Sequence, residues 1–321
     1  MRMPAILAAL AASVAALPAL PAVAQDDERT AEERAQDEAR QIIVEGERQT
    51  NRTARDMARE LTPRAYSSSE PLPRFQAPIC PGVWGLSPQF AQPMIDRIYD
   101  NADRAGIRIN ETENCAANVW VIVVDDPQAT YQQLREERSF LVRGLHPRVR
   151  REIANQAGPV VAWHRTSTRT LEGVVVATGF EAVTAQMESM MTGGGLVGIP
   201  TDRMSRTATA IRQDIDYAIL LVQRNALADR DLLAVADFAT MRLLGRARQP
   251  EGDTPFSTVL SFFNEDWTAD RLTEFDWAYL DSLYGGRPNM PSRMALRNLG
   301  TRMINASDER EEREGVTPSG S

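Results

Sequence analysis

The chain has 321 residues and a formal net charge of −8. It contains no lysine, so all 36 side chains counted as Lys+Arg are arginines, which excludes a Schiff-base lysine, a Walker-A lysine and a Ser-Lys dyad. The acidic balance also argues against nucleic acid as a partner, because neutralising phosphates requires a basic surface.

The first residues predict export to the periplasm. Arg2 supplies a positive n-region ahead of an apolar stretch at 6–20, and AVA at 22–24 marks a cleavage site before Gln25. Charged residues follow at once, which indicates a signal peptide over 1–24 and no transmembrane segment. The mature chain of about 297 residues (321 − 24) is long enough for one large domain or two small ones.

After the signal peptide we predict a charged, disordered leader over 25–40, which has too few large apolar groups to fold. QIIVEG at 41–46 predicts a short strand, and TARDMARELTPR predicts a helix that its proline ends. An amphipathic helix is predicted over 87–106, with Ser87 as its N-cap and Gly106 just past its end. The apolar residues that recur at every fourth position are Phe90, Met94, Ile98 and Ala102.

The strongest strand signal is NVWVIVVDD at 118–126, whose continuous apolar run indicates burial on both faces. Helices are predicted to follow it, the first with Pro127 near its N1 position and the second over HPRVRREIANQ. PVVAWH, EGVVVAT and DYAILLVQ predict further strands. VADFATMRLLG at 235–245 predicts a helix that closes on a glycine.

Towards the C-terminus, LTEFDWAYLDSLYGG predicts a helix that begins with a capping box between Thr273 and Asp276. The polar end of the chain predicts a disordered tail over 305–321. Strands and helices are interspersed without strict βαβ order, so we predict one α+β domain over 41–304.

Cys80 and Cys115 are the two cysteines of the chain. In an oxidising compartment an isolated pair usually forms a disulfide, which here would close a loop of roughly 35 residues. The alternative is a reactive thiol pair, but the spacing is not the C-x-x-C spacing that lowers a thiol pKa.

The histidines give little support for metal chemistry. His146 and His164 are the two in the sequence, and neither has a partner at the H-x-x-x-H spacing of a catalytic zinc site. We therefore predict no metal and no cofactor. His164 is expected to lie hydrogen-bonded at the end of a strand, and the alternative is a general base in a triad assembled by the fold.

Acidic residues offer a second candidate for chemistry. Asp125 and Asp126 follow the strongest strand, where a cleft often lies, although acids just before Pro127 are also typical of a helix N-terminus. No G-x-S-x-G elbow and no aspartic-peptidase motif is present. The candidate cleft residues are Asp125, Asp126, His164 and Asp276.

Two further stretches each have two interpretations. TGGGLVG at 192–198 matches no phosphate-binding motif, and the methionines near it are either core residues or a soft contact face. These methionines are Met187, Met190, Met191 and Met204. VRGLHPRVRRE at 142–152 gathers arginines that either cover an exposed helix face or hold anionic groups of envelope lipids or polymers. These arginines are Arg143, Arg148, Arg150 and Arg151.

The region of about 210–295 resembles a zincin-like domain without its zinc motif. DYAILLVQ would be the edge strand over the site helix. Aligning FATMRLLG with H-E-x-x-H-x-x-G puts Phe238, Ala239 and Arg242 at the two ligand positions and the general-base position, with Gly245 on the glycine. An aromatic ring, a methyl group and a guanidinium cannot polarise a metal-bound water, so this resemblance implies no peptidase activity.

The downstream helix pattern D-x-x-x-L-x-x-L-Y, from Asp276 to Tyr284, is similar to an uncharacterised family of secreted alphaproteobacterial proteins that carry such a degenerate domain. PLPRFQAPICPGVWGLSP, within 70–125, shows a weaker similarity to related exported proteins. The resemblance implies a zincin-like mixed sheet with packed helices and an exported location.

The sequence therefore favours a periplasmic, non-catalytic binding or envelope-associated protein, a pseudoenzyme whose partner is an envelope protein or an anionic envelope component. The alternative is a hydrolase that uses the acids near Asp126 or a site around His164. A third hypothesis, a purely structural partner protein, predicts an exposed apolar patch instead of a cleft.

Overall fold

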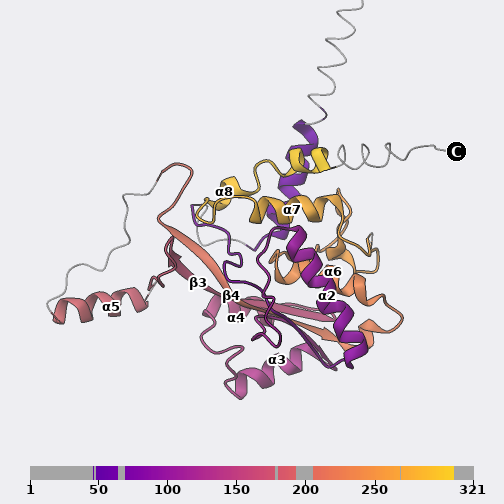
Figure 1. The fold of residues 1–321 in the computed structure, drawn as a ribbon, viewed down its shortest axis with the longest axis horizontal. Coiled ribbons are helices and arrows are strands. Elements are labelled where there is room, and N and C mark those ends of the chain that lie inside the picture. Colours follow the sequence, from indigo (N-terminus) through magenta and orange to yellow (C-terminus); the bar gives the residue numbers. More distant parts are fainter. Residues whose placement is uncertain are drawn as a thin grey trace, which may run out of the picture. The chain divides into compact units, whose positions relative to one another are not determined.

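A computed structural model describes residues 46, 48–63, 69–177, 180–192, 205–267 and 269–306, all within one compact unit, Glu45–Ser321. A mixed four-stranded sheet lies between helices, which confirms the predicted single α+β domain (Figure 1). The predicted signal peptide, the leader, the strand at 41–46 except Gly46, and most of the tail lie outside the described residues.

The sheet has the strand order β1-β2-β4-β3. Its strands are β1 (Pro81–Trp84), β2 (Val119–Val124), β3 (Val160–Thr170) and β4 (Ile211–Gln223). β1 and β4 run parallel to β2, and β3 is antiparallel to β4. The expectation that DYAILLVQ forms an edge strand is wrong, because β4 pairs on both sides and Ala218 to Val222 are completely buried, as in a strand covered on both faces.

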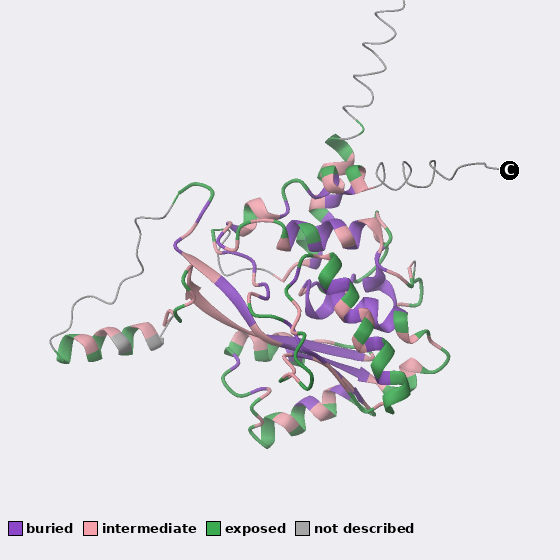
Figure 2. Cartoon of the chain, viewed as in Figure 1, coloured by how far each residue is buried: buried purple, intermediate pink, exposed green. Residues whose placement is uncertain are grey.

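Helices cover both faces of the sheet, as Figure 1 shows. On one face lie α2 (Pro88–Arg104), α6 (Leu232–Leu243) and α7 (Glu274–Tyr284), and on the other lie α3 (Pro127–Glu136) and α4 (Pro147–Ala154). β2 serves both faces, since Val119 and Val121 join the first hydrophobic core and Trp120 and Ile122 pack against the second. Figure 2 shows burial concentrated in the strands and in α6.

The remaining elements complete the unit around this sandwich. They are α5 (Phe180–Met191), α8 (Ser292–Ala295), the short 3₁₀ turns η1 (Arg224–Leu227) and η2 (Val259–Ser261), and helical segments at 48–61 and 299–306. The first helical segment ends just before Pro63, as expected, and Asn51 Oδ1 accepts a hydrogen bond from Gly300 N at 3.1 Å, which joins the two helical segments. Within the described part of the chain, none of the helices combines the length and apolarity that crossing a bilayer requires.

Local sequence signals are largely confirmed. Pro127 begins α3 behind an Asp126 N-cap, and the capping box between Thr273 and Asp276 is formed in full. Ser87 occupies the N-cap position of α2, but its side chain makes no capping hydrogen bond. The apolar stripe of α2 is buried from its second member onward, whereas Phe90 is 47% exposed.

Two expectations are wrong. EGVVVAT does not form a strand: the chain turns at Gly173 (φ 92°), and only Val175 makes an isolated bridge, with Arg169, while its side chain stays 59% exposed. The methionines of α5 are not core residues, since Met187 and Met191 are 61% and 83% exposed. Met190 is likewise exposed, and Met204 lies outside the described residues together with most of the glycine-rich stretch.

The predicted disulfide is confirmed. Cys80 and Cys115 are bonded across a sequence separation of 35 residues. Cys80 comes directly before β1 and Cys115 shortly before β2, so the bond closes the loop that carries α2 from one parallel strand to the next.

Candidate functional site

The three positions that the zincin-like alignment singles out lie on α6 and are buried. Phe238 and Ala239 have no exposed surface, and Phe238 packs edge-on against Phe263 with ring centroids 4.9 Å apart. Arg242 donates through Nη1 to the carbonyl of Ala247 at 2.8 Å and through Nη2 to Gln156 Oε1 at 3.1 Å. Burial lowers the pKa of Arg242 to about 10, so the guanidinium stays charged at neutral pH. Side chains therefore fill the place where this helix would border a cleft.

His164 lies on β3 and ties that strand to the end of α6. Its Nε2 is 2.9 Å from the carbonyl of Leu243, so this nitrogen carries the hydrogen and donates. Burial lowers the pKa of His164 to about 3, with the charge of Arg246 acting in the same direction. The ring is a neutral, hydrogen-bonded core group, as in the first of the two interpretations offered by the sequence. The expected position at a strand end is wrong, because His164 is the fifth of the 11 residues of β3 and the strand continues to Thr170. His146 caps α4, where its Nδ1 accepts from Arg148 N at 3.2 Å.

The carboxylates that the sequence singled out are in three different places. Asp126 caps α3 by accepting from Ala129 N at 2.9 Å, and the Asp125 side chain is 92% exposed and pairs with Arg224 at 3.3 Å. Asp276 is completely buried at the start of α7. No hydrogen bond or ion pair between described residues joins these carboxylates to one another or to His164.

Asp276 is a structural acceptor. Its two carboxylate oxygens accept from Thr258 Oγ1 at 2.6 Å, Val259 N at 2.9 Å and Thr273 N at 3.0 Å. Burial raises its pKa to about 6, and these donors oppose that shift. The carboxylate thus fastens the turn at η2 to the first turn of α7. Across the described residues, no group of three or more His, Cys, Asp and Glu side chains is placed to hold a metal ion.

Two polar networks were not anticipated from the sequence. In the first, the fully buried Asp237 of α6 binds Arg97 of α2 bidentately, at 2.7 and 2.9 Å, and accepts from Asn101 Nδ2 at 2.7 Å. Asn101 also donates to Thr240 Oγ1 at 3.0 Å. This network links two helices of one layer and is closed to solvent on the α6 side.

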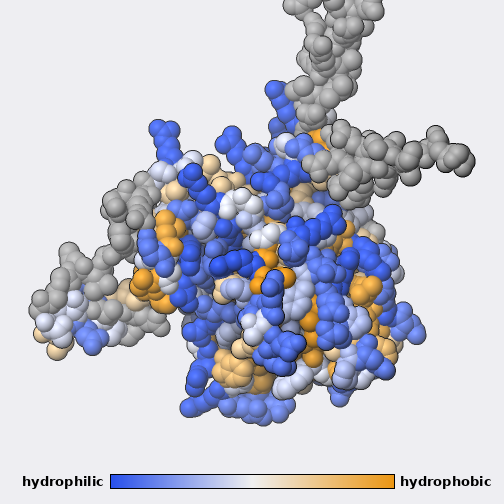
Figure 3. Space-filling model, viewed as in Figure 1, coloured by the Kyte–Doolittle hydropathy of each residue, from blue (hydrophilic) through white to orange (hydrophobic). Residues whose placement is uncertain are grey.

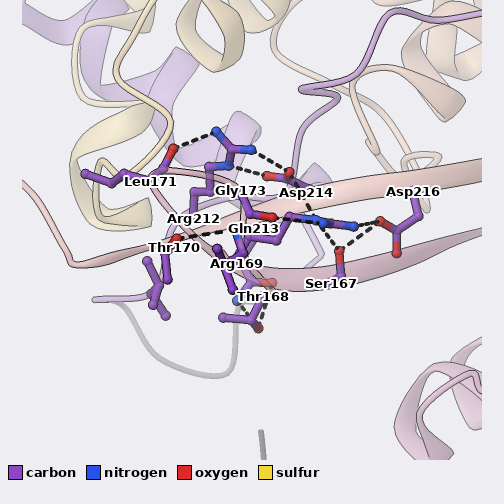
Figure 4. A network of polar contacts seen from close by, with 12 residues as sticks. Ser167, Thr168, Arg169, Thr170, Leu171, Gly173, Arg212, Gln213, Asp214 and Asp216 are labelled. Atoms are coloured by element: carbon purple, nitrogen blue, oxygen red, sulfur yellow. Dashed lines mark hydrogen bonds and ion pairs between the residues drawn. The ribbon is translucent and has the colours of Figure 1, made fainter. Parts of the chain in front are cut away.

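The second network joins the far ends of β3 and β4 (Figure 4). Arg169 and Arg212 are directly opposite each other, and the Asp214 carboxylate lies 3.4 Å from Arg169 Nε and 3.0 Å from Arg212 Nε. Asp216 pairs with Arg169 Nη2 at 3.2 Å and accepts from Ser167 Oγ at 2.8 Å. Burial raises the pKa of Asp214, and the two arginines oppose this. The paired charges balance, so we assign the network to holding the hairpin together.

Two of the arginines flagged by the sequence, Arg143 and Arg150, line a hollow between α3 and α4. Its volume is about 450 Å³, within the range of ligand pockets, and its wall contains four arginines and one acid. These residues are Arg135, Arg138, Arg143, Arg150 and Glu136. Figure 3 shows mainly hydrophilic side chains over the visible face of the protein, with hydrophobic residues in small separate groups.

The wall of the hollow contains more arginines than acids, with Glu136 as its one carboxylate in the described part of the chain. Among the described residues, none of the four lining arginines forms an ion pair with a carboxylate, whereas Arg148 pairs with Glu152 at 2.9 Å. Burial raises the pKa of the Tyr131 phenol, and the charges of Arg135 on α3 and Arg150 on α4 act against this shift.

No protein-family model, curated protein or solved structure matched this chain. The resemblance of 210–295 to degenerate zincin-like proteins therefore stays a prediction.

Sequence reasoning found half of the arginines of the hollow. Arg143 and Arg150 belong to the cluster at 142–152, but Arg151 does not line the hollow and Arg148 is paired. Arg135 and Arg138 come from α3 and the turn after it and were missed. One signal was available, since two predicted helices joined by a short loop are expected to pack as neighbours.

Proposed function

We propose that this protein is an exported, non-catalytic binding protein that recognises anionic groups through the hollow between α3 and α4. The observation that carries the proposal is the set of four arginines, Arg135, Arg138, Arg143 and Arg150, which surround one hollow without carboxylate partners in the described chain. Guanidinium groups bind phosphate and carboxylate oxygens in bidentate geometry, and several on one concave surface reinforce each other.

The charge of the whole chain supports a specific site over general attraction. With a net charge of −8 the protein repels anions on average, whereas the wall of the hollow places four arginines against Glu136 alone. An anion approaching this side meets a local positive field from these arginines. Export, proposed from residues 1–24, would bring the site into contact with phosphate-bearing components of the cell envelope.

The test uses inorganic pyrophosphate as the probe and isothermal titration calorimetry as the measurement. The Arg143→Ala/Arg150→Ala double variant should lose affinity at least tenfold, because it removes two of the four guanidinium groups that line the hollow. Arg151→Ala is the matched control: Arg151 is exposed on the same helix as Arg150 but does not line the hollow. Its affinity should stay within about twofold of wild type.

Raising the salt concentration should weaken pyrophosphate binding to the wild-type protein, since exposed charges are screened. It should have little effect on the residual pyrophosphate affinity of the double variant. The proposal fails if the wild-type protein does not bind pyrophosphate at low salt, or if the double variant and the Arg151→Ala control bind equally well.

A further inference from the structure

The loop between α3 and α4, residues 137–146, is held in one shape by the strands beneath it. Trp163 Nε1 donates to the carbonyl of Leu141 at 2.9 Å, and the Tyr217 hydroxyl donates to the carbonyl of Phe140 at 3.0 Å. Arg165 Nη1 donates to the carbonyl of Arg143 at 2.8 Å. Side chains of β3 and β4 therefore hold three backbone carbonyls of this loop, all between residues 140 and 143.

One apolar side chain of this fixed loop points outward. Phe140 is 65% exposed, whereas Val142 and Leu145 are buried in the hydrophobic core beneath the loop and Leu141 packs against it. A phenyl ring held in water by an ordered backbone loses the hydrophobic stabilisation that burial would give it. The other apolar residues of the loop are buried or packed against the core, so the Phe140 ring is the apolar group that this loop offers to a partner.

The exposed ring and the arginines of the hollow share the same loop. Arg138 precedes Phe140 by two residues and Arg143 follows it by three, and both line the hollow. The acids closest in sequence are Glu136, on the wall of the hollow, and Glu137, which accepts from Gln133 Nε2 at 2.8 Å. Counted together, the four arginines of the hollow outnumber Glu136 and Glu137, so positive charge exceeds negative charge on this side of the loop.

This combination points to the surface of a lipid bilayer. We infer that the loop docks on a membrane that contains anionic phospholipid: the arginines bind headgroup phosphates and Phe140 inserts at the boundary between headgroups and acyl chains. A soluble anion or a charged polymer would engage the arginines but offers no apolar layer for the ring. Peripheral proteins that bind anionic membranes combine basic residues with aromatic side chains in this way. The inference rests on the anion-binding function proposed above and names the source of the anion.

The first experiment is cosedimentation with vesicles of phosphatidylglycerol and phosphatidylethanolamine, with phosphatidylcholine vesicles as the neutral control. The wild-type protein should bind the anionic vesicles at least tenfold more strongly than the neutral ones. Phe140→Ala should lower binding to anionic vesicles about tenfold and leave pyrophosphate affinity unchanged. Phe90→Ala is the matched control, because Phe90 is also exposed, at 47%, but belongs to α2 on the other face of the sheet.

A second experiment detects insertion directly. Phe140→Trp and Phe90→Trp are each mixed with vesicles that contain brominated acyl chains, and tryptophan fluorescence is compared with wild type. Additional quenching is expected for Phe140→Trp and not for Phe90→Trp. Both positions are exposed, so both variants should fold, which circular dichroism verifies.

The outcomes separate the two proposals. Binding of pyrophosphate without binding of anionic vesicles overturns the membrane inference and leaves the anion site standing, as does a Phe140→Ala variant that binds vesicles like wild type. Equal binding to neutral and anionic vesicles also overturns the membrane inference. The same holds if a soluble acidic protein displaces the vesicles and the fluorescence of Phe140→Trp is not quenched. If the wild-type protein binds neither pyrophosphate nor anionic vesicles, the proposed anion-binding function is overturned as well.

Discussion

At the scale of single residues, the candidates for chemistry turn out to be structural groups. His164 donates to Leu243, Asp126 caps α3, and Asp276 accepts hydrogen bonds from Thr258, Val259 and Thr273 at the start of α7. Each is a polar residue at the end or edge of a buried element, where an unmatched backbone or side-chain group needs a partner. Catalytic and structural polar residues look alike in a sequence, because both kinds occur at strand and helix ends.

His164 leads to a prediction about pH. Its pKa is about 3 in the folded protein, against about 6.5 in an unfolded chain. As the pH falls below 6.5, the unfolded chain takes up a proton that the folded protein does not, so the free energy of unfolding should decrease between pH 6.5 and 3. His164→Gln removes this titration, while its amide can still donate to the Leu243 carbonyl.

The measurement is the urea midpoint of both proteins between pH 7 and pH 4. The midpoint of the wild-type protein should fall more steeply than that of His164→Gln. Asp276 has a raised pKa of about 6 and acts in the opposite direction, gaining stability as the pH falls through 6, but it is present in both proteins and cancels in the comparison. Parallel pH curves would show that His164 is not the acid-sensitive group.

At the scale of elements, one buried carboxylate couples α2 to α6. Asp237 is fully buried and holds both Arg97 and Asn101. Asp237→Ala should lower the free energy of unfolding by about 3 kcal/mol, since it leaves a partly buried guanidinium and an amide without their acceptor. Arg271→Ala is the comparison, because it removes an exposed ion pair with Asp231 and should cost less than about 1 kcal/mol. Chemical denaturation measures the free energy of unfolding of both variants. Similar losses would show that the buried network around Asp237 stabilises the fold no more than an exposed ion pair does.

Elements governed by local signals were predictable. Pro127 and the Thr273–Asp276 capping box fix helix starts through contacts within four residues, and their predictions are confirmed. The internal position of β4 was not predictable, because it depends on pairing with β2, some 100 residues earlier in the chain. The burial of Asp276 likewise depends on Thr258, 18 residues away. The candidate site was half predictable: Arg143 and Arg150 belong to the arginine-rich stretch 142–152, whereas Arg135 and Arg138 belong to α3 and the turn after it, and the packing of α3 near α4 brings all four to one hollow.

At the scale of the whole molecule, the disulfide and the predicted signal peptide over 1–24 lead to a prediction about the mature protein. Cys80→Ser/Cys115→Ser should lower the free energy of unfolding by about 3–4 kcal/mol in the chain-entropy model, since the bond closes a loop of 35 residues. If the chain is exported, the native protein should be oxidised and its intact mass should correspond to a start at Gln25. A reduced thiol pair in protein purified from the periplasmic fraction, or a retained N-terminal segment, would contradict this prediction. Dithiothreitol should destabilise the wild type and leave the double variant unaffected.

The strand order has a consequence for how the protein is made. β3 pairs with β4 and with no other strand of the sheet, and β2 meets β3 only through β4. Until residues 211–223 have been synthesised, a growing chain can form the short β1–β2 pair but cannot close the sandwich. A polypeptide that crosses a translocation channel must remain unfolded during passage. Because β4 lies two thirds of the way along the chain, the sheet can close only late in synthesis, and if the chain is exported as proposed, its earlier segments are still open when transport begins.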